Sequence, residues 1–428
     1  MKESFLHYIW QFRKFEGATS SQILLSDENK KIQILNPGRY NQLAGPDFFN
    51  AQVRIDDQLW AGNVEIHIKS SDWYMHRHET DAAYDNVILH VVWDDDCAVY
   101  DKANLPIPTL VLKNKIPTTL LHNYRNLVEI QKSGFINCET SIAEVPTDRL
   151  EHWLERVYFE RLEYKVTQVQ QKLAATQGDW EAVLFQTLMR NFGTVINADA
   201  FEELAQKIPF KTVRKLARQE QLEPILLGLA GLLKARLDSQ ELVQWKADFD
   251  YNRKKFDLPD GIEHQVQFFK LRPPNFPTIR LSQLAMLYTK NDTLFSSLMN
   301  AKTREEIQDI FKVNTSNFWK THFTFDKSHT PRAKYLSKAF IDVLIINTII
   351  PVQFAYARAR GLDNQEQLLM LLASIPLEKN RVVKNFEEIL KFKKDALHSQ
   401  ALLHLKTKYC DLNRCLQCEV GNFLIANA

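Results

Sequence analysis

The chain has 428 residues, more than one hydrophobic core usually supports, and at about 150 residues per domain it predicts two or three domains. Its 45% hydrophobic and 25% charged residues are typical of a globular protein and exclude a largely disordered chain. The formal net charge of +2 excludes an overall positive field, so any binding of nucleic acid must use a local patch.

The cellular location is predicted from the apolar stretches and the cysteines. The opening MKESFLHYIW is interrupted by Glu3 and His7 and is too short for the apolar part of a signal peptide. Residues 339–357 are the best candidate for a membrane span, but Asp342 and Pro351 favour a buried helix instead. Five cysteines, three of them within the last twenty residues, suit a reducing compartment. We therefore expect a cytoplasmic protein that is not bound to a membrane.

The front of the chain predicts a helix, then a sheet. In residues 4–16, apolar Phe5, Ile9, Phe12 and Phe15 lie near helical spacing. Short β-branched and aromatic runs between turn residues then predict strands: QILLS, KIQIL, NAQVRID, QLWAGNVEIHIK, NVILHVVW and TLVLKN. Residues 72–84 begin with capping residues and lack Gly and Pro, so we expect a helix there that joins two parallel strands. These elements predict an α/β domain over residues 1–138.

Helical periodicity dominates the rest of the chain. Thr147 and Asp148 predict the cap of a long helix with one apolar face. Further apolar-periodic stretches are found at residues 180–192, 223–237, 281–298, 340–357 and 365–372. We expect a large all-helical domain over residues 139–428.

Titratable residues concentrate in the expected sheet. Glu65, His67 and Lys69 alternate with apolar residues, so one face of their strand presents a carboxylate, an imidazole and an ammonium in a row. This row resembles the catalytic strand of the PD-(D/E)xK nuclease superfamily. The resemblance implies a restriction-endonuclease-like mixed sheet with flanking helices, in which Asp47 and Glu65 hold Mg²⁺ or Mn²⁺. His67 occupies the position of the usual catalytic lysine, and Lys69 lies farther along the same face.

The register of the first hairpin is a difficulty for this site. If Asp56 and Asp57 form a two-residue loop, then Phe48 rather than Asp47 falls opposite Glu65. The carboxylates meet only if Asp47 precedes the regular strand, if a bulge intervenes, or if the loop has three residues.

Two other interpretations of this region stay open. The Glu65 face could be a solvated sheet surface whose histidines serve packing. Alternatively, imidazoles could form a transition-metal site, since they suit Zn, Fe or Ni. The candidate residues are His67, His76, His78 and His90. In the nuclease interpretation, His76, His78 and Asp81 are accessory residues.

The chain as a whole resembles a bacterial domain-of-unknown-function family over nearly its full length. The segments that carry this resemblance are GPDF (45–48), GNVEIHIKSSDW (62–73), HRH (76–78), ILHVV (88–92), GLAGLL (228–233), RPPNFPTIRL (272–281) and YCDLNRCLQCEVG (409–421). This resemblance implies no activity.

The last segment carries cysteines whose spacings of four and two residues suit a metal centre: Cys410, Cys415 and Cys418. Cys138 is the best candidate for a fourth ligand of zinc or an iron–sulfur cluster, ahead of Cys97 and His404. A distant cysteine joined to three C-terminal ones resembles the iron–sulfur plan of some PD-(D/E)xK nucleases. Reduced, buried thiols are the alternative.

The proline-rich motif contributes Arg272 and Arg280, which could bind a phosphate together. The alternative is a rigid joint between domains whose arginines cap helix C-termini.

Taken together, these patterns predict a metal-dependent nucleic-acid phosphodiesterase. The alternative is a non-catalytic nucleic-acid-binding or scaffold protein with a degenerate nuclease-like site. The sequence leaves open whether the protein is an enzyme.

Overall fold

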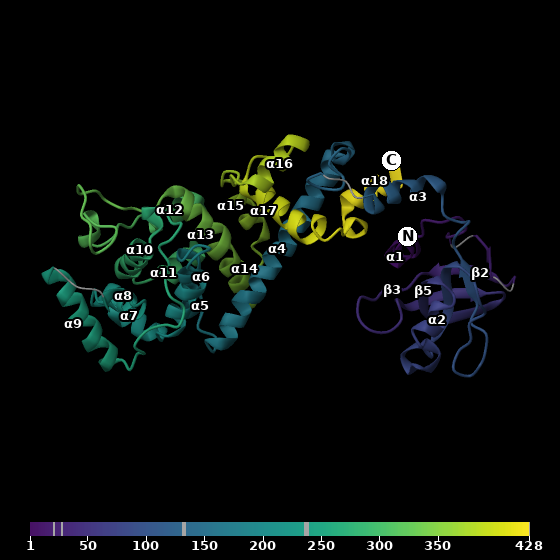
Figure 1. Ribbon diagram of the computed structural model, residues 1–428, viewed down its shortest axis with the longest axis horizontal. Helices are drawn as coiled ribbons and strands as arrows, with labels where there is room; N and C mark the ends of the chain where they lie inside the picture. The colour runs from purple at the N-terminus through teal and green to yellow at the C-terminus, as the bar shows by residue number, and fades with distance from the viewer. Residues whose placement is uncertain (20–21, 27–28, 131–133, 235–238, 428) are drawn as a thin grey trace. The chain divides into compact units, whose positions relative to one another are not determined.

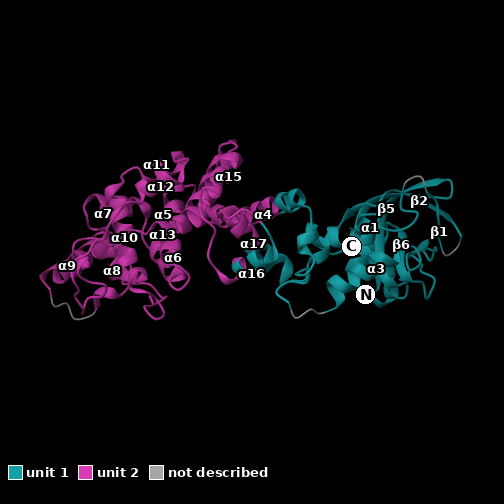
Figure 2. Cartoon of the chain, turned by 90° about the horizontal axis from the view of Figure 1, so that it is seen from above, with its two compact units in different colours: residues 1–153, 384–391, 403–428 teal, residues 154–383, 392–402 magenta. Residues whose placement is uncertain are grey.

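The computed structural model describes residues 1–427 except 20–21, 27–28, 131–133 and 235–238 (Figure 1). The chain divides into two compact units (Figure 2). Unit 1 contains residues 1–153, 384–391 and 403–428, and unit 2 contains residues 154–383 and 392–402. These units do not coincide with the ranges 1–138 and 139–428 expected from the sequence. The first division falls inside helix α4 (Thr147–Ala175), where no change in composition marks it.

Unit 1 is built on a mixed sheet. Its strands are β1 (Leu24–Leu25), β2 (Lys31–Asn36), β3 (Arg39–Tyr40), β4 (Phe48–Ile55), β5 (Gln58–Lys69), β6 (Val87–Asp94) and β7 (Thr109–Val111). The strand order is β1-β2-β4-β5-β6-β7, with β3 paired to β4. Pairing is antiparallel up to β5, whereas β5, β6 and β7 are parallel. The expected mixed sheet, followed by many helices, is confirmed.

A bulge corrects the register of the β4–β5 hairpin. Its loop has two residues, and Ile55 pairs with Gln58 as expected. The register shifts between Phe48 and Ala51, where Asn50 adopts a φ of 57°. Asparagine tolerates this left-handed conformation better than most residues. Beyond the shift, Phe48 pairs with Val64, so the residue before the strand comes opposite Glu65.

The crossover from β5 to β6 contains a shorter helix than expected. Helix α2 covers only Asp72–Met75, and 3-10 turns follow at His78–Thr80 and Ala82–Tyr84. The expected continuous helix over residues 72–84 is therefore wrong. Trp73 is buried with Val87 and Val99, but no apolar residue lies three or four positions after it to continue that face. Arg77 instead reverses the chain with a φ of 63°.

Helix α1 (Glu3–Gln11) packs against β5 and buries Phe5 and Ile9. It ends five residues earlier than expected, and Phe12 is 45% exposed instead of facing the core. The other helices that lie wholly in unit 1 are α3 (Thr118–Tyr124) and α18 (Glu419–Asn427).

Unit 2 is helical. Its helices are α5 (Trp180–Phe192), α6 (Ala198–Gln206), α7 (Phe210–Arg218), α8 (Leu222–Leu229), α9 (Gln240–Lys255), α10 (Pro277–Lys290), α11 (Leu294–Asn300), α12 (Arg304–Ile310), α13 (Lys338–Leu344), α14 (Ile350–Ala359) and α15 (Gln365–Ala373). Helices α4, α16 (Arg381–Ile389) and α17 (Ala396–Leu405) contribute residues to both units. Of the expected stretch 223–237, residues 235–237 lie outside the described part of the chain.

A long apolar segment runs through α13 and α14. By length and composition Lys338–Ala359 could cross a membrane, and 78% of its apolar window is buried within the protein. Asp342, the acidic residue of this segment, accepts two hydrogen bonds of 2.7 and 2.8 Å from Arg304. This bidentate ion pair explains how an acidic residue is accommodated in an apolar helix.

Candidate functional site

Two carboxylates meet where β4 begins beside β5. The backbone N–H of Asp47 donates to Glu65 Oε2 at 3.1 Å, and the N–H of Ile66 donates to Asp47 Oδ2 at 3.0 Å. These reciprocal bonds hold both side chains next to each other, and Glu65 is only 5% exposed. The structure thus brings together the two residues that the sequence predicted as metal ligands.

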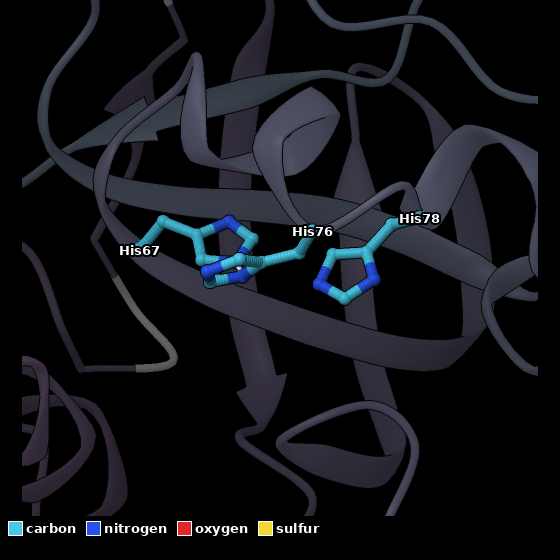
Figure 3. Close-up of side chains that lie close together, drawn as sticks. All are labelled: His67, His76 and His78. Atoms are coloured by element: carbon cyan, nitrogen blue, oxygen red, sulfur yellow. Dashed lines mark hydrogen bonds between the residues drawn. The ribbon is translucent and has the colours of Figure 1, made fainter.

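Three imidazoles gather beside Glu65, and their rings lie close together in Figure 3. His67 Nε2 lies 3.2 Å from His76 Nδ1 and 3.5 Å from Glu65 Oε1. His78 Nε2 lies 3.3 Å from the same oxygen. One ligand atom from each of the three histidines lies within 4.8 Å of the other two. Strand β5 carries His67, His76 is the C-cap of α2, and His78 begins the 3-10 turn after the left-handed residue Arg77.

A fourth histidine, His90, orients His67 through a hydrogen bond between their rings. His90 of β6 is in register with Glu65, and its Nε2 lies 2.8 Å from His67 Nδ1. Burial lowers the pKa of His67 to about 2 and that of His90 to about 3, so both are neutral at neutral pH. When His67 Nδ1 donates this bond, His67 Nε2 presents a lone pair toward Glu65 and His76. A metal-binding histidine needs this tautomer, with its other nitrogen held by a hydrogen bond.

The charge states on the two sides of Glu65 differ. Burial raises the pKa of Glu65 to about 7, the Asp47 carboxylate adds to the rise, and His78 opposes it. Although burial disfavours its charge, His7 has a pKa raised to about 10 by hydrogen bonds to Asp47 and Glu3. Its Nε2 lies 3.2 Å from Asp47 Oδ2 and 3.5 Å from Glu3 Oε1. A cationic imidazole therefore neutralises Asp47, while the neutral imidazole of His67 lies beside Glu65.

The sequence analysis did not identify His7 as a site residue. Glu3, His7 and Asp47 form a second group whose ligand atoms lie within 4.8 Å of one another. Glu3 and His7 are four residues apart on a helix whose other positions are largely apolar. That spacing was the available signal, but only the packing of α1 against β5 brings the pair to Asp47.

Two predicted residues lie outside this cluster. Lys69 is exposed at the end of β5. Its backbone N–H donates to the Asp72 carboxylate. Asp81 is also exposed and caps the 3-10 turn Ala82–Tyr84 by accepting from the N–H of Ala83. Neither side chain joins the described metal-ligand groups.

The two arginines of the proline-rich motif both lie in unit 2 but in different environments. Arg272 is exposed, whereas Arg280 is 4% exposed. The Arg280 guanidinium donates to Asn275 at 2.6 Å and to Gln283 at 3.0 Å, and it lies 3.4 Å from the ring centroid of Phe340. Arg280 stands in the first turn of α10 and does not cap a helix C-terminus.

The four cysteines proposed as a second metal centre line one pocket within unit 1: Cys138, Cys410, Cys415 and Cys418. The two alternative ligands are not among the residues that line it. Cys97 instead interacts with Ser70 at the far end of β5, and His404 is buried in α17.

The family model described as "Protein of unknown function (DUF2851)" matches residues 3–381. No curated protein and no solved structure matches the chain.

Proposed function

The chain belongs to the DUF2851 family, and we propose that its front unit is a metal-dependent phosphodiesterase that acts on nucleic acid. One observation carries the proposal. The bulge in β4 puts Asp47 against Glu65 on the strand that also carries His67, beside two further imidazoles. Carboxylate oxygens next to imidazole nitrogens form a set of donors for a divalent metal ion.

Glu65, His67 and His78 would hold the ion, with His76 next to them. Mixed oxygen and nitrogen donors suit Mn²⁺ or Zn²⁺ better than Mg²⁺, which prefers oxygen ligands and retained water. When bound, such an ion lowers the pKa of its water and neutralises charge that develops on a phosphodiester. Asp47, held by His7 and by the Ile66 N–H, keeps Glu65 in place through its own backbone N–H.

The order of elements supports the nucleic-acid part of the proposal. Helix α1, strands β2, β4 and β5, the crossover and strand β6 follow one another in the order of the PD-(D/E)xK core. In that comparison Asp47 and Glu65 correspond to the two acidic residues, and His67 replaces the lysine. An imidazole that is neutral at pH 7 can bind metal or orient water, whereas a lysine can only orient it. A restriction-endonuclease-like fold is therefore part of the proposal.

The test combines metal binding with cleavage. The full chain is freed of metal and titrated calorimetrically with Mn²⁺, Zn²⁺ and Mg²⁺. Labelled single-stranded DNA, double-stranded DNA and RNA are then incubated with each loaded form. We expect Mn²⁺ or Zn²⁺ to bind and to support cleavage of at least one substrate. Glu65→Gln should weaken metal binding by about 100-fold and remove cleavage, because an amide oxygen is a poor replacement for a carboxylate ligand.

Glu16→Gln is the matched control, since Glu16 is exposed and lies in the same unit. It should leave metal affinity and cleavage unchanged. Equal metal affinity in wild type and Glu65→Gln would remove the site. Metal binding without cleavage of any substrate would replace the proposal by the non-catalytic alternative, in which unit 1 binds nucleic acid or serves as a scaffold.

A further inference from the structure

Four cysteines from two distant parts of the sequence line one cavity in unit 1. Cys138 follows the segment after α3, whereas the other three lie in the turns between α17 and α18. Cys410 ends a π-helical turn, Cys415 begins a 3-10 turn, and Cys418 directly precedes α18. No local pattern in the sequence requires Cys138 to come back to this place.

The backbone around the cavity is shaped for this convergence. A Cβ at Gly421 would lie 2.0 Å from the carbonyl oxygen of Cys415, so α18 can approach the 3-10 turn only because this position lacks a side chain. The same close approach places Cys418 between the turn and the helix, with its side chain buried.

Hydrogen-bond donors point at the sulfur atoms. The backbone N–H groups of Val420 and Gly421 and the side chain of Trp153 favour the thiolate form of Cys418. Asn137 Nδ2 donates to Cys415 Sγ at 3.7 Å. A neutral thiol is a weak acceptor, whereas a metal-bound thiolate is negatively charged and is stabilised by such donors. The donors are therefore those that a cluster of thiolates needs.

The surrounding charge also fits bound thiolates. Arg414 lines the cavity, and the positive charge of Lys406 acts on the Cys410 sulfur. Four ionised sulfurs in one buried cavity require a compensating cation, which a metal centre would provide.

The spacing of the sulfurs distinguishes between two kinds of centre. A single tetrahedral zinc ion with bonds near 2.3 Å brings its four sulfurs to about 3.8 Å from one another. Among the described residues, which include all the cysteines, no three sulfur atoms lie within 4.8 Å of one another. A polynuclear centre, with several metal ions between its ligands, fits this wider arrangement.

We propose that Cys138, Cys410, Cys415 and Cys418 bind an iron–sulfur cluster. Each thiol releases its proton to solvent as its sulfur–iron bond forms. The cluster ties the final turns of the chain to the segment that follows α3, and its binding free energy contributes to folding there. This inference is independent of whether unit 1 cleaves nucleic acid.

The experiment uses the full chain, produced with iron and purified without oxygen. Iron, inorganic sulfide and zinc are quantified in the same sample, and the visible absorption spectrum is recorded before and after reduction with dithionite. We expect iron and sulfide in equal amounts and a visible absorption that dithionite bleaches. Cys138→Ser should lower the iron content by at least about tenfold, because one of four ligands is lost. Cys97→Ser, a cysteine outside the cavity, should retain the iron.

Several results would overturn the proposal. One zinc ion per chain without sulfide would mean a mononuclear site, and the absence of both metals would mean buried thiols. Full iron and sulfide in Cys138→Ser would remove Cys138 from the ligand set. Should Cys138→Ser fail to fold, the metal and sulfide content of wild type still decides whether a cluster is present. Reconstitution of the reduced, metal-free wild type with ferrous iron and sulfide tests independently whether a cluster forms.

Discussion

Replacing Glu65 by glutamine should remove the pH dependence that Glu65 gives to the local stability of β5 in metal-free protein. The amide keeps the size of the side chain but cannot ionise. Burial raises the pKa of Glu65 from 4.5 to about 7, a difference of 7 − 4.5 = 2.5. At 1.36 kcal/mol per pKa unit this corresponds to about 3 kcal/mol.

The sign follows from the raised pKa. The folded state binds the proton of Glu65 more tightly than the unfolded state, so the contribution of Glu65 to stability is complete below about pH 4.5. It is lost as the pH rises through about 7, because a charged carboxylate is then buried without metal. Relative to wild type, Glu65→Gln should therefore gain about 3 kcal/mol between pH 4.5 and pH 8.

Hydrogen exchange of the segment 58–69 measures this quantity locally, which avoids treating two units as one cooperative transition. Wild type and Glu65→Gln are compared with chelator at pH 5 and pH 8, after correction for the intrinsic exchange rate. Mn²⁺ at about 100 times its Kd should protect wild type by about 2.7 kcal/mol at pH 8 and should not protect the variant. The exposed Glu16→Gln serves as control. An identical pH dependence in wild type and Glu65→Gln would refute the raised pKa and the buried charge.

Three further predictions concern other parts of the structure. His90→Phe should weaken metal binding by about 10- to 100-fold in calorimetry without removing a ligand, because His67 loses the partner that orients it. Asn50→Val should destabilise unit 1 by about 1–2 kcal/mol, and Asn50→Gly should not, because valine is strained at a positive φ; urea unfolding of both variants tests this. Arg280→Ala should lower the free energy of unfolding of unit 2 by about 3 kcal/mol, since the buried Gln283 and the partly buried Asn275 lose their donor. The exposed Arg272→Ala should change it by less than about 0.5 kcal/mol in the same urea titration, and equal effects of the two variants would contradict this assignment.

Local sequence patterns predicted much of the fold. Alternating β-branched residues predicted the strands of unit 1, and the two-residue loop at Asp56 predicted the hairpin pairing of Ile55 with Gln58. The change from alternation to helical periodicity predicted the helical remainder, including α5 at residues 180–192. These features depend on interactions within a few residues of one another, so the order of residues alone contains them.

The candidate site was only partly predictable. Glu65 and His67 share a strand face, which alternation alone shows. Asp47 reaches Glu65 because the bulge at Asn50 moves the register by one residue, and the sequence offered that bulge as only one of three options. The expected helix after β5 hid the left-handed residue Arg77, which separates His76 at the end of α2 from His78 in the next turn.

The sequence by itself therefore determined much of the secondary structure, apart from the crossover after β5, and the chemical identity of the candidate ligands, because propensity, alternation and spacing act over short distances. Only the tertiary structure decided which of those groups meet. It brought His7 to Asp47 through the packing of a helix on a strand, and Cys138 to Cys410 and Cys418 through the return of the chain to unit 1. Such contacts join residues far apart in the sequence, and their geometry is set by how whole elements bury their apolar faces.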